Sequence, residues 1–283
     1  MKIEDYILDR YSEKSLPRYM NQINLFRATQ GGSTEQSTYS DIVNYIGDLR
    51  ERGLHAKSLR NHLFSLKIYF RYLVEIGKRQ EHPCENLQLK DQINREIIIE
   101  ELYSKEDLEE LYKTYQSKTN KTKFIKIRDR VILSLLIYQA LTTNEIIELR
   151  KEDISIEEGE VRIREIERKN RRGNKGRILA LHPKQMLLIY DYYQLINEGY
   201  FIQTEAGKKL YGAYISRMLR HHPKYFTPIK IRQSVIANLL KTAADLRLVQ
   251  EFAGHRRTGS TEAYKRTGLE ELKSSIERLH PRQ

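Results

Sequence analysis

The sequence lacks the features that mark secreted and membrane proteins. Its 283 residues include one cysteine, Cys84, so an intrachain disulfide framework is excluded and a reducing compartment is expected. No apolar run approaches the roughly 18 residues that a membrane-spanning helix needs. The first residues mix charges of both signs and contain no apolar signal-peptide core. These absences predict a cytoplasmic protein.

Positive charge is the first indication of a partner. The chain has 50 Lys and Arg residues against 38 Asp and Glu residues, a formal net charge of +12. Cations that neutralise phosphates release counterions, so a basic protein of this kind is expected to bind a polyanion such as DNA. A merely basic soluble protein would have the same charge, so composition alone does not decide between the two.

The first part of the chain is patterned as helices. Apolar residues recur at helical spacing after a possible N-cap at Ser37 or Thr38, and again after Ser58, which we expect to cap the next helix. Gly77 stands where a helix commonly ends. These features predict a small all-α domain over residues 1–94. Periodicity is lost between about 78 and 102, which indicates a linker.

The second part, residues 103–283, mixes helices and strands. Ser104 with Asp107 is typical of a helix N-terminus, and a strongly apolar helix is expected from about Ile127 to Leu141. Two strands are expected at 156–166 and 176–181, joined by a charged hairpin turn. Helices then resume from Pro183. The predicted fold class is mainly α with a small β-sheet.

The most specific pattern lies between Thr227 and Tyr264. Arg232 opens a helical run, a Gly254-His255 pair follows, and Tyr264 stands alone after a Ser-Thr step. Each residue taken singly would usually be core or solvated surface. Their order, spacing and intervening sequence together resemble the signature of the tyrosine recombinases, the phage-integrase and Xer-type family.

This resemblance implies an architecture and a chemistry. It implies an N-terminal helical core-binding, SAM-like domain and a mixed α/β catalytic domain, which together clamp double-stranded DNA. Tyr264 would attack phosphorus and leave a 3′-phosphotyrosine and a free 5′-hydroxyl, with no metal, ATP or other cofactor. Arg232 would clamp two phosphate oxygens, and His255 would donate a hydrogen bond to the phosphate.

Three positions depart from the family's pattern. Thr142 stands where the family's first arginine is expected, Ile229 replaces the histidine three residues before Arg232, and Arg172 aligns with the hairpin lysine that acts as the acid. Arginine is a poor proton donor because its pKa exceeds about 12. Substitutes can be proposed for the hairpin lysine, the histidine and the first arginine in turn: Lys169 or Lys175; Lys230; and Arg128, Arg130 or Arg150.

Two groups of basic residues are expected to contact DNA phosphates. Such contacts position a protein on DNA and do not reveal the sequence that it reads. The hairpin and the N-terminal bundle respectively contribute Arg168, Lys169, Arg171, Lys175 and Arg177, and Lys57, Arg60, Lys67 and Arg71. The pair His221-His222 lacks the further ligands of a metal site.

The sequence is compatible with two functions. The first is a site-specific recombinase or integrase of a prokaryotic mobile element or transposon. It would act near the nucleoid as a homotetramer on paired sites, alone or with another recombinase or accessory protein. The second is a weak or inactive paralogue that binds recombination sites without cutting. The amphipathic segment 268–280 would dock either on a neighbouring protomer or on its own domain.

Overall fold

The chain forms two compact units, the first containing residues 1–95 and the second most of the remainder. The computed structural model describes residues 1–30, 34–92, 97–116, 121–165, 167–168, 171–220, 222, 226–242 and 245–264. The C-terminal amphipathic segment expected at 268–280 lies outside these residues. None of the described helices is both long and apolar enough to cross a membrane.

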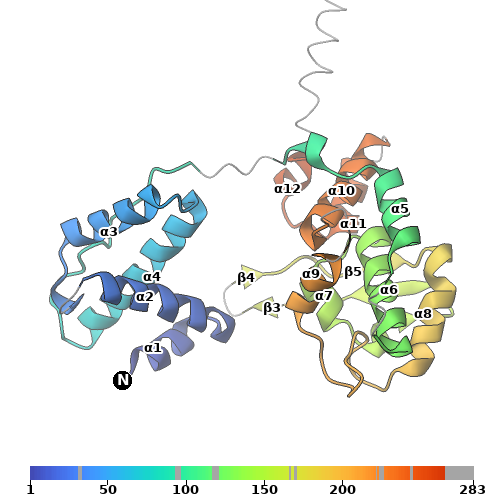
Figure 1. The fold of residues 1–283 in the computed structure, drawn as a ribbon, viewed down its shortest axis with the longest axis horizontal. Helices are drawn as coiled ribbons and strands as arrows, with labels where there is room; N and C mark the ends of the chain where they lie inside the picture. Colours follow the sequence, from blue (N-terminus) through green and yellow to red (C-terminus); the bar gives the residue numbers. More distant parts are fainter. Residues whose placement is uncertain are drawn as a thin grey trace, which may run out of the picture. The chain divides into compact units, whose positions relative to one another are not determined.

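The first unit is a helical bundle (Figure 1). Its helices are α1 (Ile3–Arg10), α2 (Leu16–Thr29), α3 (Tyr39–Glu51) and α4 (Ala56–Glu75), with short 3₁₀ turns η1 (Glu13–Ser15) and η2 (Thr34–Gln36). The helix α4 packs against α1, α2 and α3, because its apolar stripe recurs at helical spacing. Among the buried side chains are Ile23, Phe26, Leu66 and Phe70, all 0% exposed.

The helix ends of this bundle test the expected caps. Thr38 is the N-cap of α3, where its hydroxyl accepts from the backbone N–H of Asp41 in a capping box. The expectation that Ser58 caps the next helix is wrong. That helix begins at Ala56, because the imidazole of His55 accepts from the Lys57 N–H and caps it earlier. Gly77 follows the end of α4 with φ +73°, a conformation that glycine adopts at little cost.

The second unit is built around the buried helix α6 (Lys123–Tyr138), which packs against α5 (Lys105–Thr114), α8 (Pro183–Leu195) and α10 (Pro228–Lys241). The other described helices are α7 (Thr143–Glu148), α9 (Gly212–Arg220), α11 (Leu246–Ala253) and α12 (Gly259–Glu262), with 3₁₀ turns η3 (Ile99–Glu101) and η4 (Lys151–Asp153). Ser104 caps α5 in a capping box with Asp107, as the sequence predicts.

A small antiparallel sheet completes the second unit. Strands β1 (Ile154–Ser155), β2 (Glu160–Ile163) and β5 (Arg177–Ala180) form three strands in the order β1-β2-β5. Val161 pairs with Leu179, and both side chains are buried in the core. Strands β3 (Glu167–Arg168) and β4 (Arg171–Arg172) pair separately as the hairpin. The unit is therefore mainly helical with a small sheet, the predicted fold class.

The segment after α6 differs from the expected long helix and prepares the site. The helix ends at Tyr138 instead of Leu141, because Ala140 adopts the left-handed conformation, with φ +49°. A non-glycine residue in this conformation costs about 1–2 kcal/mol. The turn redirects the chain so that Thr142 can cap α7.

Candidate active site

The centre of the site is the carboxylate of Glu145 in the first turn of α7. The Thr142 hydroxyl caps this helix, and the Thr142 backbone N–H and hydroxyl both donate to Glu145 Oε2, at 2.8 and 2.9 Å. The carboxylate is only 4% exposed. Thr142, where the resemblance leads us to expect the family's first arginine, therefore has the contacts of a helix cap.

Arg232 reaches this carboxylate from α10. The helix starts at Pro228, after Thr227 caps it by accepting from the Lys230 N–H. The Arg232 guanidinium donates to the carbonyls of Ala140 and Ala253, the second at 2.5 Å, and its Nη1 lies 3.8 Å from Glu145 Oε2. The side chain thus joins the turn after α6 to the end of α11. Burial lowers the pKa of Arg232 from its usual value, and the charge of Glu145 opposes that effect.

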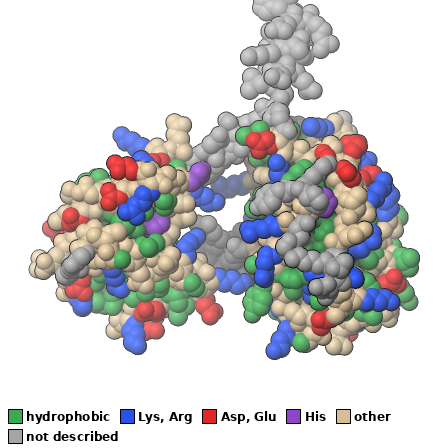
Figure 2. Space-filling view, viewed as in Figure 1, with side chains coloured by type: hydrophobic (Ala, Val, Ile, Leu, Met, Phe, Trp, Pro, Cys, Tyr) green, Lys and Arg blue, Asp and Glu red, His purple; other side chains and the backbone are tan. Residues whose placement is uncertain are grey.

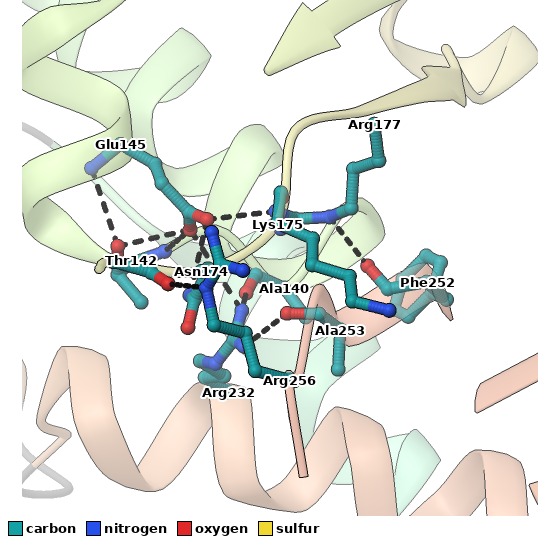
Figure 3. Close-up of polar contacts among 11 residues, drawn as sticks. Ala140, Thr142, Glu145, Asn174, Lys175, Arg177, Arg232, Phe252, Ala253 and Arg256 are labelled. Carbon is teal, nitrogen blue, oxygen red and sulfur yellow. Dashed lines mark hydrogen bonds and ion pairs between the residues drawn. The ribbon is translucent and has the colours of Figure 1, made fainter. Parts of the chain in front are cut away.

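Arg177 reaches the same carboxylate from the start of β5. Its Nη1 donates to Glu145 Oε1 at 2.7 Å, and its Nε donates to the Phe252 carbonyl at 2.7 Å. Asn174 donates to the same Glu145 oxygen at 3.1 Å. Figure 3 shows Glu145 with Thr142 close to one oxygen and Arg177 close to the other. Arg177 was expected on a DNA-facing surface, yet its side chain is only 7% exposed.

The charges explain how Glu145 stays ionised in a buried position. Burial would raise the pKa of Glu145, but the charge and hydrogen bond of Arg177, the Thr142 N–H and the charge of Arg232 together hold that pKa below its usual value. A buried carboxylate requires such partners, because an isolated charge in the protein interior is strongly disfavoured.

His255 and Tyr264 lie beside this charged cluster. Gly254 ends α11 in the left-handed conformation, with φ +68°, and directs the chain into His255. The ring Nδ1 of His255 lies 2.9 Å from the Thr261 hydroxyl oxygen. The rings of His255 and Tyr264 are nearly parallel, at 13°, with centroids 6.4 Å apart. Tyr264 is 9% exposed and packs with apolar side chains of α10 and α11.

The charge of Arg232 acts on both rings. Burial, followed by the charges of Arg232 and Arg177, lowers the pKa of His255 to about 4, so its imidazole is neutral at pH 7. Burial raises the pKa of Tyr264, and Arg232 opposes that rise. The phenol is therefore protonated at neutral pH, and Arg232 is the described cation that favours its phenolate form.

The three arginines proposed as substitutes for the first arginine make their described contacts elsewhere. Arg128 donates to the Gln203 carbonyl and pairs with Asp129. The guanidinium of Arg130 lies over the ring of Tyr112, and that of Arg150 lies 3.9 Å from the ring centroid of Tyr200. None of these three has a described contact with Glu145.

The helix α10 carries the position of the missing histidine. Ile229 is 72% exposed in its first turn. The ammonium of Lys230 lies 5.1 Å from the ring centroid of Tyr103. The cluster thus includes Arg232 from α10, while the side-chain ammonium of Lys230 lies near an aromatic ring.

The basic hairpin is described only in part. The structure gives the backbone of Arg168, Arg171 and Arg172 in β3 and β4, and Lys169 lies outside the described residues. Lys175 is exposed, and its backbone N–H donates to the Gly254 carbonyl at 2.9 Å. Arg256 donates to the Gly173 carbonyl at 2.8 Å. The base of the hairpin and the segment before Tyr264 therefore hold each other in place.

The basic residues of the first unit share one face of α4 by the helical period. Arg60 and Lys67 donate to the carbonyls of Asp91 and Glu85, at 2.6 and 2.7 Å. Lys57 and Arg71 are exposed. Figure 2 shows Lys and Arg side chains on the visible face of each unit. His62, which lies between these basic residues in the sequence, is buried and bonds to Tyr45.

Sequence reasoning missed the pairing of Glu145 with Arg177. The available signal was Glu145 itself, an acidic residue retained directly after an apolar helix without the expected arginine. A carboxylate in such a setting needs a cation, and the arginine that supplies it comes from a strand 32 positions later. The contacts of Asn174 and Arg256 with this region were also missed, because their partners lie far away in the sequence.

Comparisons with known proteins identify the family of the chain. Residues 101–270 match the phage integrase family, and residues 3–77 match the phage integrase N-terminal SAM-like domain. The tyrosine recombinase XerC of Actinobacillus succinogenes is 27% identical over 288 residues, which cover 96% of this chain and 93% of that protein. The tyrosine recombinase XerD of Rickettsia prowazekii is 25% identical, with 98% and 93% covered.

Solved structures share the fold. The Tn1549 transposon integrase in complex with a circular intermediate DNA has a TM-score of 0.66 and 14% identity, with 99% of this chain and 100% of that chain covered. A lambda integrase dimer bound to a core site has a TM-score of 0.65 and 15% identity, with 93% and 92% covered. Since the integrase model matches more than half of the sequence and the N-terminal model matches the helical bundle, the chain belongs to the phage integrase family of tyrosine recombinases.

Proposed function

We propose that this recombinase cleaves and rejoins double-stranded DNA at specific sites through Tyr264. The supporting observation is that Arg232, His255 and Tyr264, which come from three segments, lie in one cluster in which the charge of Arg232 acts on both rings and Arg232 pairs with Glu145. A nucleophile beside cations that can hold a phosphate is the arrangement that phosphoryl transfer requires.

The reaction proceeds in two matched steps. The Tyr264 oxygen gives its proton to water and bonds to phosphorus, and the bond from phosphorus to the 5′-oxygen breaks. That oxygen takes up a proton from a lysine of the hairpin or from water and leaves as a 5′-hydroxyl, while the strand stays attached as a 3′-phosphotyrosine. A 5′-hydroxyl from a second strand then attacks the same phosphorus and restores the tyrosine. The bond energy is conserved, so no ATP is needed.

The side chains divide the work as follows. Arg232 binds nonbridging phosphate oxygens with its planar guanidinium. His255, neutral because of its lowered pKa, donates a hydrogen bond from Nε2 when Nδ1 accepts from Thr261. Lys175 in the hairpin gives the leaving oxygen its proton, or Arg172 donates a hydrogen bond to that oxygen while water supplies the proton, and Lys230 adds positive charge at the start of α10. Loss of one preorganised donor costs on the order of 10²–10³ in rate.

The rest of the chain positions the DNA. Residues 1–94 act as the core-binding domain and residues 103–283 as the catalytic domain, with the linker between them. The face of α4 with Lys57, Arg60, Lys67 and Arg71 and the basic hairpin bind phosphates. The active form is a homotetramer on paired sites of a mobile element, associated with the nucleoid of a prokaryotic cell.

A nicked duplex tests the cleavage proposal. The duplex is first selected from a random pool by the Tyr264→Phe protein, and a nick is then placed near the cleavage site so that the released fragment diffuses away and rejoining stops. We expect a denaturant-resistant protein–DNA adduct with the wild-type chain and with Tyr211→Phe, a matched change at a tyrosine that is 82% exposed. Tyr264→Phe should give no adduct.

Binding without any adduct would contradict cleavage by this chain. The result would instead support a paralogue that occupies recombination sites. Testing the same duplex together with an active recombinase would then show whether this chain contributes to a mixed assembly.

A further inference from the structure

The charges of the site do not balance among its described residues. Two guanidinium groups, Arg177 and Arg232, face the single carboxylate of Glu145. His255 adds no charge at neutral pH, because its pKa is lowered to about 4. One positive charge is therefore in excess in a buried place, and a buried excess charge calls for an anion.

Arg177 also has an unused donor. Its Nε is bonded to the Phe252 carbonyl and its Nη1 to Glu145, at 2.7 Å each. Its Nη2 is buried and has no hydrogen-bond partner among the residues that the structure describes. Most buried polar atoms in proteins have a hydrogen-bond partner. An unpaired donor on a side chain that is only 7% exposed therefore indicates that a bound ligand supplies the missing acceptor.

The surroundings are built to bring this guanidinium close to the backbone next to His255. Gly254 lies against Arg177, and a Cβ at that position would stand 2.6 Å from Nη1. The segment is held there because Lys175 N–H donates to the Gly254 carbonyl and Arg256 donates to the Gly173 carbonyl. Arg177 is close enough to Arg232 and His255 to lower the pKa of each.

We propose that Arg177 Nη2 binds a nonbridging oxygen of the phosphate attacked by Tyr264, so that Arg177 and Arg232 hold that phosphate together. This proposal rests on the proposed function and deepens it. Arg177 supplies from β5 the guanidinium that the chain lacks at Thr142. Glu145 orients the Arg177 guanidinium through the bond to Nη1, and Nη2 remains to bind the DNA phosphate.

The competing explanation is that Arg177 only neutralises Glu145. A purely structural arginine would affect folding and would have no preference for any particular phosphate of the DNA. An arginine that binds one DNA phosphate would instead make the binding affinity depend on the charge at that one position of the DNA backbone. The two explanations therefore differ in a binding measurement that needs no cleavage.

The experiment is a protein–DNA double-mutant cycle in the Tyr264→Phe chain. The probe is the selected duplex, prepared as a series in which one uncharged methylphosphonate replaces each phosphate of the central region in turn. Binding is measured at fixed salt for three proteins: the parent, Glu145→Gln, and Glu145→Gln with Arg177→Met. The double variant removes both partners of the Arg177–Glu145 pair, so that Arg232 is the one guanidinium of the cluster left without the carboxylate.

We expect one phosphate in each half of the duplex at which the methylphosphonate weakens DNA binding by the parent and by the Glu145→Gln protein by about tenfold. The same methylphosphonate should weaken DNA binding by the double variant by less than about threefold. Arg177→Lys, which keeps a charge opposite Glu145 but removes Nη2, should show a smaller effect than the parent. Arg162→Ala, a change at an exposed arginine of β2, should behave as the parent. Thermal unfolding of each protein confirms that it is folded.

Equal losses for the parent and the double variant at every position, or no positional effect in either, would overturn the proposal. Failure of the proposed function is seen separately, as the absence of an adduct with the Tyr264 protein on the nicked duplex. The cycle uses the phenylalanine variant, so it reports on Arg177 whichever way that cleavage test turns out.

Discussion

Replacing Glu145 by glutamine should destabilise the second unit strongly. The carboxylate is 4% exposed and accepts from Arg177, Asn174 and both donors of Thr142. A glutamine keeps the shape but has one acceptor oxygen, so its amide N–H₂ faces either the arginine or the cap. Two buried guanidinium groups are then left without a counter-charge.

The magnitude follows from the cost of breaking a buried pair on one side. Removal of one partner of such a pair costs about 3–5 kcal/mol. For a unit of this size each kcal/mol lowers Tm by roughly 2–4 °C, so the expected shift is about 6–20 °C. Adding Arg177→Met removes one of the two uncompensated charges and should recover at least about half of the loss.

Urea unfolding followed by circular dichroism, with thermal scans in parallel, measures these differences. The matched control is Glu157→Gln, at an exposed glutamate in the turn before β2, which should stay within about 0.5 kcal/mol of the wild type. If Glu145→Gln unfolded within about 1 kcal/mol of the wild type, or if Arg177→Met made it less stable, the assignment of Glu145 as the counter-charge of both arginines would be refuted.

Three further predictions concern the residues around this carboxylate. Ala140→Gly should raise the free energy of unfolding by about 0.5–1 kcal/mol, since it relieves the left-handed conformation of Ala140, and the urea midpoint measures this. Thr142→Ala removes the cap of α7 and should lower the same free energy by about 1–2 kcal/mol; Thr142→Ser, which retains the hydroxyl, should restore most of it. His255 has its pKa lowered to about 4, so between pH 6.5 and 4 the unfolded chain binds a proton that the folded chain does not, and stability falls as pH falls. After allowance for solvent screening the loss between pH 7.5 and 5 is about 1–2 kcal/mol; urea unfolding at the two pH values should show a smaller loss for His255→Gln, and an equal loss would contradict the assignment.

Local signals in the sequence predicted much of the fold. Thr38 and Ser104 cap their helices as expected, since a hydroxyl placed before an apolar helical stripe acts within its own turn. The expected cap at Ser58 was wrong because the imidazole of His55 caps the helix three residues earlier. The end of α6 was misplaced because the left-handed conformation of Ala140 is not one that alanine favours.

The sequence predicted only part of the candidate site. The order and spacing of Arg232, His255 and Tyr264 drew attention to residues that the structure places in one cluster. The pairing of Glu145 with Arg177 could not be predicted, because it depends on the register of β5 against β2 and on the turn between α6 and α7. Basic residues near a hairpin look alike in sequence, and only the backbone decides which of them turns inward.

The most direct test of the central claim is the chemical identity of the protein–DNA link. The adduct trapped on the nicked duplex is digested with nuclease and trypsin, which cuts after Arg257 and Lys265, and the products are analysed by mass spectrometry. The account predicts that the peptide 258–265 carries a nucleotide on Tyr264 through a 3′-phosphate. A nucleotide on another residue, or on Tyr264 through a 5′-phosphate, would contradict it.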